Sequence, residues 1–394
     1  MSDDTEPDGG PVVDEATERV DGSTDDLLER ILARDDLVVV GFVLSLFVFP
    51  YLLVNLLTQI GEAIGFSIGG YVGLPTLVLI FGIVVIGFNL LLGYTGLLSF
   101  GHAAFFGVSA YAAGIFTAEA TAFLPTAVAH SPLAMVGVGT FAALVIAWPI
   151  GFVSIRRSGV YFAVLTLTFG QMLYYYALGP GAWLTNGDNG FSDVNVGHLL
   201  GTFELEEAIL GADFLRAYTW QYVFVAVAAV FALWMANRII NSPYGLIFKA
   251  LGQNEQRVSF VGLDVFRYKH MAFIISAGFA GAGGALFAIH ETYIHPTTSL
   301  YWITSGDFVI MTILGGTGSL VGPVLGALIF EYVSNVISGV SLPVIGAIGS
   351  LWRFVLGAVF VVIVWVFPKG VYGGVRDVVV ALTGRGDDDG GEEA

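Results

Sequence analysis

Long stretches without a single charged residue dominate the pattern of this chain. Five of them contain no Asp, Glu, Lys or Arg: residues 63–118, 120–155, 158–187, 217–237 and 308–330. A helix needs about 20 mostly apolar residues to cross a bilayer, and a charge at its centre costs roughly 3 kcal/mol on insertion scales. Uncharged blocks of this length, interrupted by short charged loops, predict an all-α, polytopic membrane protein.

The same pattern predicts about ten transmembrane or half-membrane helices. The predicted crossings are residues 37–57, 71–92, 99–118, 133–153, 160–178, 218–238, 270–289, 306–320, 321–338 and 350–368. The eighth is short, and we expect either a half-helix or a re-entrant element there, which a bilayer tolerates only inside protein or beside a water-filled cavity.

Basic residues near span ends predict which ends of the helices face the cytoplasm. They follow the fourth span, separate the sixth from the seventh, and follow the tenth: Arg156, Arg157, Arg238, Lys249, Arg257, Arg267, Lys269, Lys369, Arg376 and Arg385. All lie on one side if the chain crosses ten times with both termini cytoplasmic. The acidic loop 179–216 is then external, and Arg353, at the outer end of the tenth span, is the exception.

Much of the net charge of −17 belongs to the two ends of the chain. Residues 1–36 carry 13 acidic and 3 basic side chains, and residues 375–394 form a second acidic tail. Both are rich in Gly and Asp, so we predict disordered, solvated tails. Between them lies a predicted transmembrane domain, residues 37–374, with a cytoplasmic loop at 239–269.

The sequence carries no recognisable catalytic motif. It lacks the P-loop of ATP-binding proteins, the H-E-x-x-H zinc motif, the G-x-S-x-G elbow and any Cys. We therefore expect no catalytic residues, no metal, no cofactor bound by the chain itself and no nucleic-acid partner. An enzyme active inside the membrane is an alternative without a positive signal.

A polar, basic stretch interrupts the apolar pattern at residues 242–263, "SPYGLIFKALGQNEQRVSFVGL". Pro243 cannot continue the preceding span, because its ring clashes with the turn before it. From Leu246 onward the residues predict one helix, which ends at the C-cap Gly262.

One face of this predicted helix is partly apolar. Its members recur at intervals of three, four and three residues: Phe248, Leu251, Glu255 and Val258. Other faces carry Lys249, Gln253, Gln256 and Arg257. A helix of this kind can dock into a groove on another protein. The alternative is a surface helix that only satisfies the positive-inside rule.

Two short segments repeat the pattern L-G-x-T-G-x-L. They are "LGYTGLL" at 92–98 and "LGGTGSL" at 314–320, and each lies where one predicted span passes into the next. Internal repeats with helix breaks near the pathway are common in transporters. We therefore take Thr95, Gly96, Thr317 and Gly318 as candidates for a pathway or hinge; a chance match is the alternative.

Two ionisable residues lie inside uncharged blocks, and such groups usually face a cavity or a partner. His102 and Glu331 are therefore further pathway candidates. For His102, close to a span end, a hydrogen-bonded structural role is the favoured interpretation. For Glu331, the expectation is either a cavity or a pair with Arg353.

Several segments in order resemble the permease subunits of branched-chain amino-acid ABC importers, the LivM type more closely than the LivH type. They are "LGYTGLLSFGHAAFFGVSAYAAG", "YFAVLTLTFGQM", "TNGDNGF", "SPYGLIFKALGQNEQRVSFVGLDVFRYKHMAFIISAGFAGAGGALFA" and "ILGGTGSLVGPVLGA". The resemblance covers residues 71–374. It implies a permease in the cell membrane that moves branched-chain amino acids by alternating access, with two cytoplasmic ABC ATPase subunits, a LivH-like second permease and an extracytoplasmic substrate-binding protein.

The resemblance also identifies residues 242–263 with the cytoplasmic coupling loop of that family, and ATP is then bound by the partner subunits. The residues it implies for ATPase coupling are Tyr244, Gly245, Phe248, Lys249, Asn254, Glu255, Arg257 and Gly262. Related permeases move urea, short-chain amides or sugars, which remain alternatives. Less favoured are an ion-coupled secondary transporter, with Glu331 as its candidate ion site, and a membrane scaffold.

Overall fold

The computed structural model describes eleven stretches of the chain: residues 35–59, 70–157, 159–192, 194–199, 203–205, 207–209, 217–339, 341–342, 346–347, 352–368 and 370–374. The two predicted acidic tails lie outside the described residues, except for Asp35 and Asp36, which begin the first described helix.

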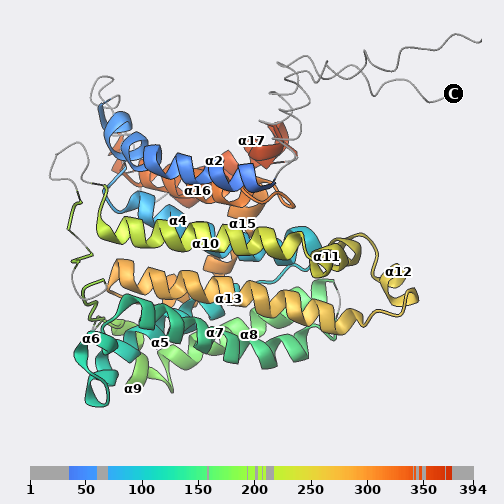
Figure 1. Ribbon diagram of the computed structural model, residues 1–394, viewed down its shortest axis with the longest axis horizontal. Helices are drawn as coiled ribbons and strands as arrows, with labels where there is room; N and C mark the ends of the chain where they lie inside the picture. The colour runs from blue at the N-terminus through green and yellow to red at the C-terminus, as the bar shows by residue number, and fades with distance from the viewer. Residues whose placement is uncertain are drawn as a thin grey trace, which may run out of the picture.

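A helix occupies each of the ten predicted spans (Figure 1). These helices are α2 Asp35–Pro50 with its π-helical continuation η1 Tyr51–Leu56, α4 Leu74–Thr95, α5 His102–Glu119, α7 Pro132–Ser154, α8 Val160–Leu178, α10 Trp220–Ile240, α13 Val265–Glu291, α15 Trp302–Gly315, α16 Gly322–Gly339 and α17 Trp352–Val366. In the described part of the chain, seven helices are long and apolar enough to cross a membrane. The prediction of an all-α polytopic fold is confirmed.

Helix α15 has the short length expected of the eighth span. Its 14 residues cover about 21 Å at the α-helical rise, whereas the hydrocarbon core of a bilayer is about 30 Å thick. The chain leaves this helix at Gly316 and begins α16 at Gly322.

The connections contain shorter elements. They are η2 Ala120–Ala122, α6 Thr126–Ala129, α9 Ala182–Thr185, η3 Gly187–Asn189, α11 Pro243–Gln253, α12 Glu255–Phe260, α14 Pro296–Ser299, and the strands β1 Ser341–Leu342 and β2 Gly346–Ala347, which pair antiparallel.

Helices α4 and α13 form the centre of the bundle and are its two most buried long helices. Glycines let them approach closely. A Cβ added to Gly87 of α4 would lie 2.2 Å from the Cβ of Phe279, and one added to Gly283 of α13 would lie 2.3 Å from Cγ2 of Val84. Backbones in a membrane come this close only where the facing residues are small.

The connections gather at two opposite ends of the bundle, with α11 and α12 at one and α6 and α9 at the other (Figure 1). Arg156, after α7, lies 5.9 Å from the ring centroid of Phe266 in α13, so it shares the end of α11. A Cβ on Gly370, after α17, would lie 2.3 Å from Cα of Gly316, beyond the C-terminus of α15. The structure thus brings the predicted cytoplasmic loops together, and the assignment of this end to the cytoplasm stays a prediction.

Candidate functional site

The loop between α10 and α13 folds as two short helices. The single helix predicted from Leu246 to Gly262 is therefore wrong. At Asn254 the backbone is extended, with φ −162° and ψ 107°, and the Asn254 side chain accepts a hydrogen bond from the backbone N–H of Arg257 at 3.1 Å. Asparagine is among the best N-cap residues, so it ends α11 and begins α12.

The first turn of α11 explains why the sequence reads S-P-Y-G. The hydroxyl of Ser242 accepts a hydrogen bond from the backbone N–H of Gly245 at 3.4 Å, and Pro243 occupies the first helical position, where its missing N–H costs nothing. A Cβ on Gly245 would lie 2.1 Å from the carbonyl oxygen of Ile240. Only glycine lets the chain turn this tightly out of α10.

The end of α12 has the cap that the sequence predicts at Gly262. This residue has φ 86°, a left-handed conformation that glycine adopts without steric cost. Its N–H donates to the carbonyl of Ser259, and the N–H of Leu263 donates to the carbonyl of Val258. This pair of bonds is the Schellman motif, which satisfies the last carbonyls of a helix.

Helix α12 has one buried apolar side chain and an ion pair to α13. Val258 is 5% exposed. Glu255, which sequence reasoning placed on the apolar face, forms an ion pair with Lys269 in α13. Lys269 is buried, with 4% exposure. The sequence marked it only as a basic residue of the loop, because nothing local identifies a partner fourteen positions away.

Helix α11 packs on the end of α4. Phe248 and Leu251 are buried. A Cβ on Gly252 would lie 2.5 Å from the carbonyl oxygen of Tyr94. The Nζ of Lys249 lies 5.8 Å from the centre of the Tyr94 ring, within cation–π range.

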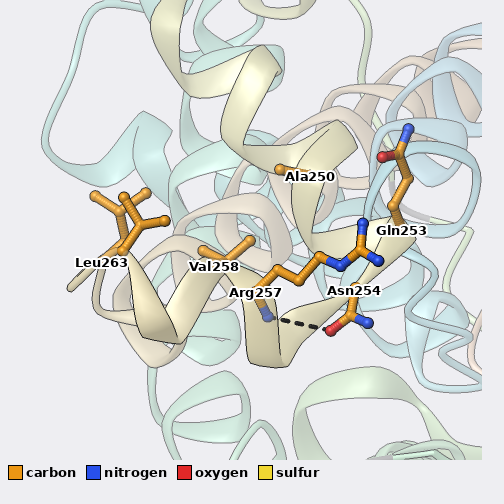
Figure 2. A pocket seen from close by; sticks show the side chains of 7 residues that line it. Ala250, Gln253, Asn254, Arg257, Val258 and Leu263 are labelled. Atoms are coloured by element: carbon orange, nitrogen blue, oxygen red, sulfur yellow. Dashed lines mark hydrogen bonds between the residues drawn. The ribbon is translucent and has the colours of Figure 1, made fainter.

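The outer surface of the two helices combines apolar and basic side chains around a hollow of about 360 Å³ (Figure 2). The lining residues are Ala250, Gln253, Asn254, Arg257, Val258, Val261 and Leu263. Phe260 and Val261 are 88% and 79% exposed, and Leu246 is exposed as well. Val261 both lines the hollow and is exposed, and exposed apolar side chains of this kind are a feature of interaction surfaces.

The two L-G-x-T-G-x-L segments meet in space at the same end of the bundle. A Cβ on Gly93 would lie 2.6 Å from the Gly318 nitrogen. Asn89, three residues before the first segment, binds the second segment: its Nδ2 donates to the carbonyl of Ser319 at 2.8 Å, and its Oδ1 accepts from the N–H of Gly318 at 2.9 Å. Gly96 and Gly318, at matching positions of the repeat, have φ 72° and 80°. Sequence reasoning missed Asn89, although it is the one amide in the apolar helix α4.

The threonines of the two segments are not brought together. Thr95 is buried and donates to the carbonyl of Leu91 in its own helix at 2.6 Å. Thr317 is exposed. Of the four candidates in the repeats, only Gly318 forms a hydrogen bond between the second segment and α4. We call this contact, made by Asn89 with Gly318 and Ser319, the Asn89 junction.

His102 is fully buried at the start of α5. Its Nδ1 lies 3.1 Å from the hydroxyl of Ser99, and its Nε2 lies 2.8 Å from the hydroxyl of Ser276 in α13. Both ring nitrogens therefore have partners within the protein. This is the geometry expected of the structural role, and a role in the pathway stays a prediction.

Glu331 lies in α16, nine residues past Gly322, or about 14 Å along the helix. It is half-buried and interacts electrostatically with Asp307 and Glu291. The charge of Arg353 acts on Asp307. Glu331 thus belongs to a group of carboxylates well removed from the Asn89 junction. In the described residues, no cluster of His, Asp and Glu could hold a metal ion.

The helices define a multi-pass membrane protein whose two central helices contact a compact, partly apolar loop at one end. Residues 70–364 match the family described as branched-chain amino acid transport system / permease component, and the chain belongs to that family.

Curated proteins that are similar to this chain are named for different substrates. The high-affinity branched-chain amino acid permease LivM of Escherichia coli is 28% identical over 272 residues, which is 66% of this chain and 62% of LivM. The putative glucose permease TsgC13 of Haloferax volcanii is 28% identical over 165 residues, 41% of this chain and 48% of TsgC13. The guanosine permease NupQ of Bacillus subtilis is 24% identical over 131 residues, 33% of this chain and 37% of NupQ.

Each of these matches spans less than two thirds of the relative's length. No solved structure matches the chain at a significant level.

Proposed function

We propose that this chain is the membrane-spanning permease subunit of an ATP-binding-cassette importer. The observation that carries the proposal is the α11–α12 loop, in a chain of the permease family. Its outer surface is apolar and basic around a hollow, and its inner surface contacts α4 and α13. A partner bound at the outer surface could displace the loop, and the inner contacts would pass this displacement to α4 and α13.

The proposed partner of this loop is a cytoplasmic ATPase subunit, which would bind ATP in place of the permease. Among the coupling residues, Tyr244, Lys249, Asn254 and Arg257 are exposed and would meet the ATPase. The others, Gly245, Phe248, Glu255 and Gly262, shape or anchor the loop.

Branched-chain amino acids are the proposed substrates. The support is the match to LivM, which extends over 272 residues. The relatives named for glucose and guanosine match over shorter stretches. Purified transporter in proteoliposomes should take up radiolabelled leucine, isoleucine or valine only when ATP is present with the ATPases. Unlabelled glucose, guanosine and urea serve as competitors. No uptake of the amino acids, together with ATP-driven uptake of one of the three competitors when it carries the label instead, would reassign the substrate.

The full proposed assembly contains two ATPase subunits, a LivH-like second permease and an extracytoplasmic substrate-binding protein. Gentle detergent purification of the tagged chain from its native membrane, followed by mass spectrometry, tests this assembly. Recovery of P-loop ATPases and a second permease would support it. Recovery of the chain alone, under conditions that preserve other importers, would favour the ion-coupled transporter and make Glu331 the first residue to replace.

We further propose that the Asn89 junction is a hinge of alternating access. Both helix ends that meet there contain a glycine in the left-handed region, Gly96 and Gly318. Helix α11 rests on the adjoining Tyr94. A tilt of α11 would therefore reach the junction through the last turn of α4.

A further inference from the structure

We propose that Lys269 is a positioning residue of the coupling loop, and that its ion pair with Glu255 transmits movement of α12 into α13. The proposal rests on the function proposed above, in which an ATPase displaces the loop. It assigns the step between loop and bundle to one pair of side chains.

The pair joins a buried cation to a partly exposed anion. The Lys269 side chain is 5% exposed and that of Glu255 is 44% exposed. Lysine is almost never fully buried unless it is paired. Within the described residues, Glu255 is the one carboxylate at ion-pair distance from Lys269. The Lys269 ammonium, near the N-terminus of α13, therefore depends on Glu255 of α12 for its counter-charge.

The covalent connection between the two helices is a short turn that contains a glycine. Helix α12 has six residues, and it reaches α13 through Val261, Gly262, Leu263 and Asp264. Gly262 has a positive φ and open space where a Cβ would be. A glycine of this kind can absorb a rotation, because it has the widest choice of backbone conformation.

The ion pair provides a second link between the two helices, across this glycine turn. If α12 moved away alone, it would leave an ammonium buried without a partner, which is strongly unfavourable. Helix α13 is therefore drawn along with α12. Because α13 meets α4 at Gly87 and Gly283 without space for a single methyl group, the displacement continues into the centre of the bundle.

The ordinary alternative is that the pair only stabilises the loop. A set of variants in the assembled transporter separates the two roles: Glu255→Gln, Lys269→Met, and the double variant. Asp264→Asn is the matched control, since it removes a carboxylate from the same loop and keeps an oxygen that can cap α13. For each variant, three quantities are measured: the thermal midpoint of the detergent-purified chain, the recovery of the ATPase, and the ATP hydrolysed per substrate transported.

Glu255→Gln removes the counter-charge of the buried ammonium and leaves it only an amide oxygen as acceptor, so it should lower the thermal midpoint by a few degrees. The double variant, which strands no charge, should recover most of this loss. Both should keep the ATPase bound and hydrolysing, yet lose most substrate uptake, so that the ATP used per substrate rises severalfold. The control should match the wild type in all three quantities.

Two results would overturn the proposal. The first is Glu255→Gln with normal uptake per ATP. The second is a double variant that recovers transport together with stability, because a Gln–Met contact cannot hold the helices through charge. If Glu255→Gln does not fold, the double variant decides. The thermal midpoints are measured on the purified chain and need no partner. If the wild-type transporter showed no ATP-driven uptake, the proposed function would be refuted, while the contribution of the ion pair to stability would still have been measured.

Discussion

Replacing Asn89 by leucine tests the junction between the two repeated segments. The side chain is 2% exposed and makes two hydrogen bonds, one to the carbonyl of Ser319 and one from the N–H of Gly318. Leucine has the same number and branching of side-chain heavy atoms as asparagine, and it is apolar like most of α4. The substitution therefore removes the two bonds with little change in packing.

The expected loss follows from the surroundings of the two freed backbone groups. A net hydrogen bond contributes about 0.5–1.5 kcal/mol, and a buried polar group left without a partner costs about 1–3 kcal/mol. Gly318 is exposed, so its N–H regains water, whereas Ser319 is half-buried. We expect a loss of about 2–3 kcal/mol, which corresponds to a fall of roughly 3 °C in the thermal midpoint.

The assay is thermal unfolding of the detergent-purified chain, followed by intrinsic tryptophan fluorescence. The control is Thr168→Val, because the Thr168 hydroxyl is exposed and bonds only to Val164 in its own helix. Gly93→Ala should reproduce the loss, since its Cβ would lie 2.6 Å from the Gly318 nitrogen. The double variant Asn89→Leu with Gly93→Ala should lose less than the sum. An unchanged midpoint for Asn89→Leu would refute this account of the junction.

Three further predictions address other contacts. Gly252→Ala should lower the thermal midpoint, because its Cβ would lie 2.5 Å from the Tyr94 carbonyl oxygen. The control Gly137→Ala, whose Cβ would have nothing within 4 Å, should raise the midpoint, because alanine has the higher helix propensity. Equal shifts in the two variants would contradict the packing of α11 on α4. His102→Leu should cost about 1–3 kcal/mol, because it removes the partner of the Ser276 hydroxyl and leaves the Ser99 hydroxyl only the N–H of Gly101. A melting curve like the wild type's would argue against the structural role, and uptake by the folded variant reports on the pathway. Arg257→Ala should weaken ATPase co-purification and uptake at an unchanged midpoint, since only its backbone caps α12; normal association with wild-type uptake would remove Arg257 from the interface.

The positions of the long helices could be predicted because the bilayer imposes them. Lipid excludes charges and requires runs of a fixed length, so the charge pattern alone places α4, α7 and α13 to within a few residues at most ends. The shortness of α15 follows from the same pattern. A larger departure is the start of α13, which extends five residues before the predicted span because its first turns belong to the loop.

The parts that escaped prediction depend on contacts between distant segments. At Asn254 the chain can either continue one helix or cap a new one, and the local cost of the two is similar. The burial of Phe248 and the ion pair of Glu255 with Lys269 favour the new helix. Lys269 and Asn89 each needed a partner that the sequence does not indicate. The repeat could be recognised in the sequence, but the hydrogen bonds of Asn89 to the second repeated segment could not be predicted from it.

Three attachments hold the α11–α12 loop, and together they restrict how it can move. Gly245 fixes it to the end of α10, Gly252 seats it on α4, and Glu255 pairs with Lys269 of α13. A displacement absorbed at one attachment would strain the other two, so the loop must move with α4 and α13 as one body. The conformational change then has to occur outside the glycine contact of α4 and α13. The proposed hinge at the Asn89 junction, where α4 meets the segment between α15 and α16, satisfies this condition.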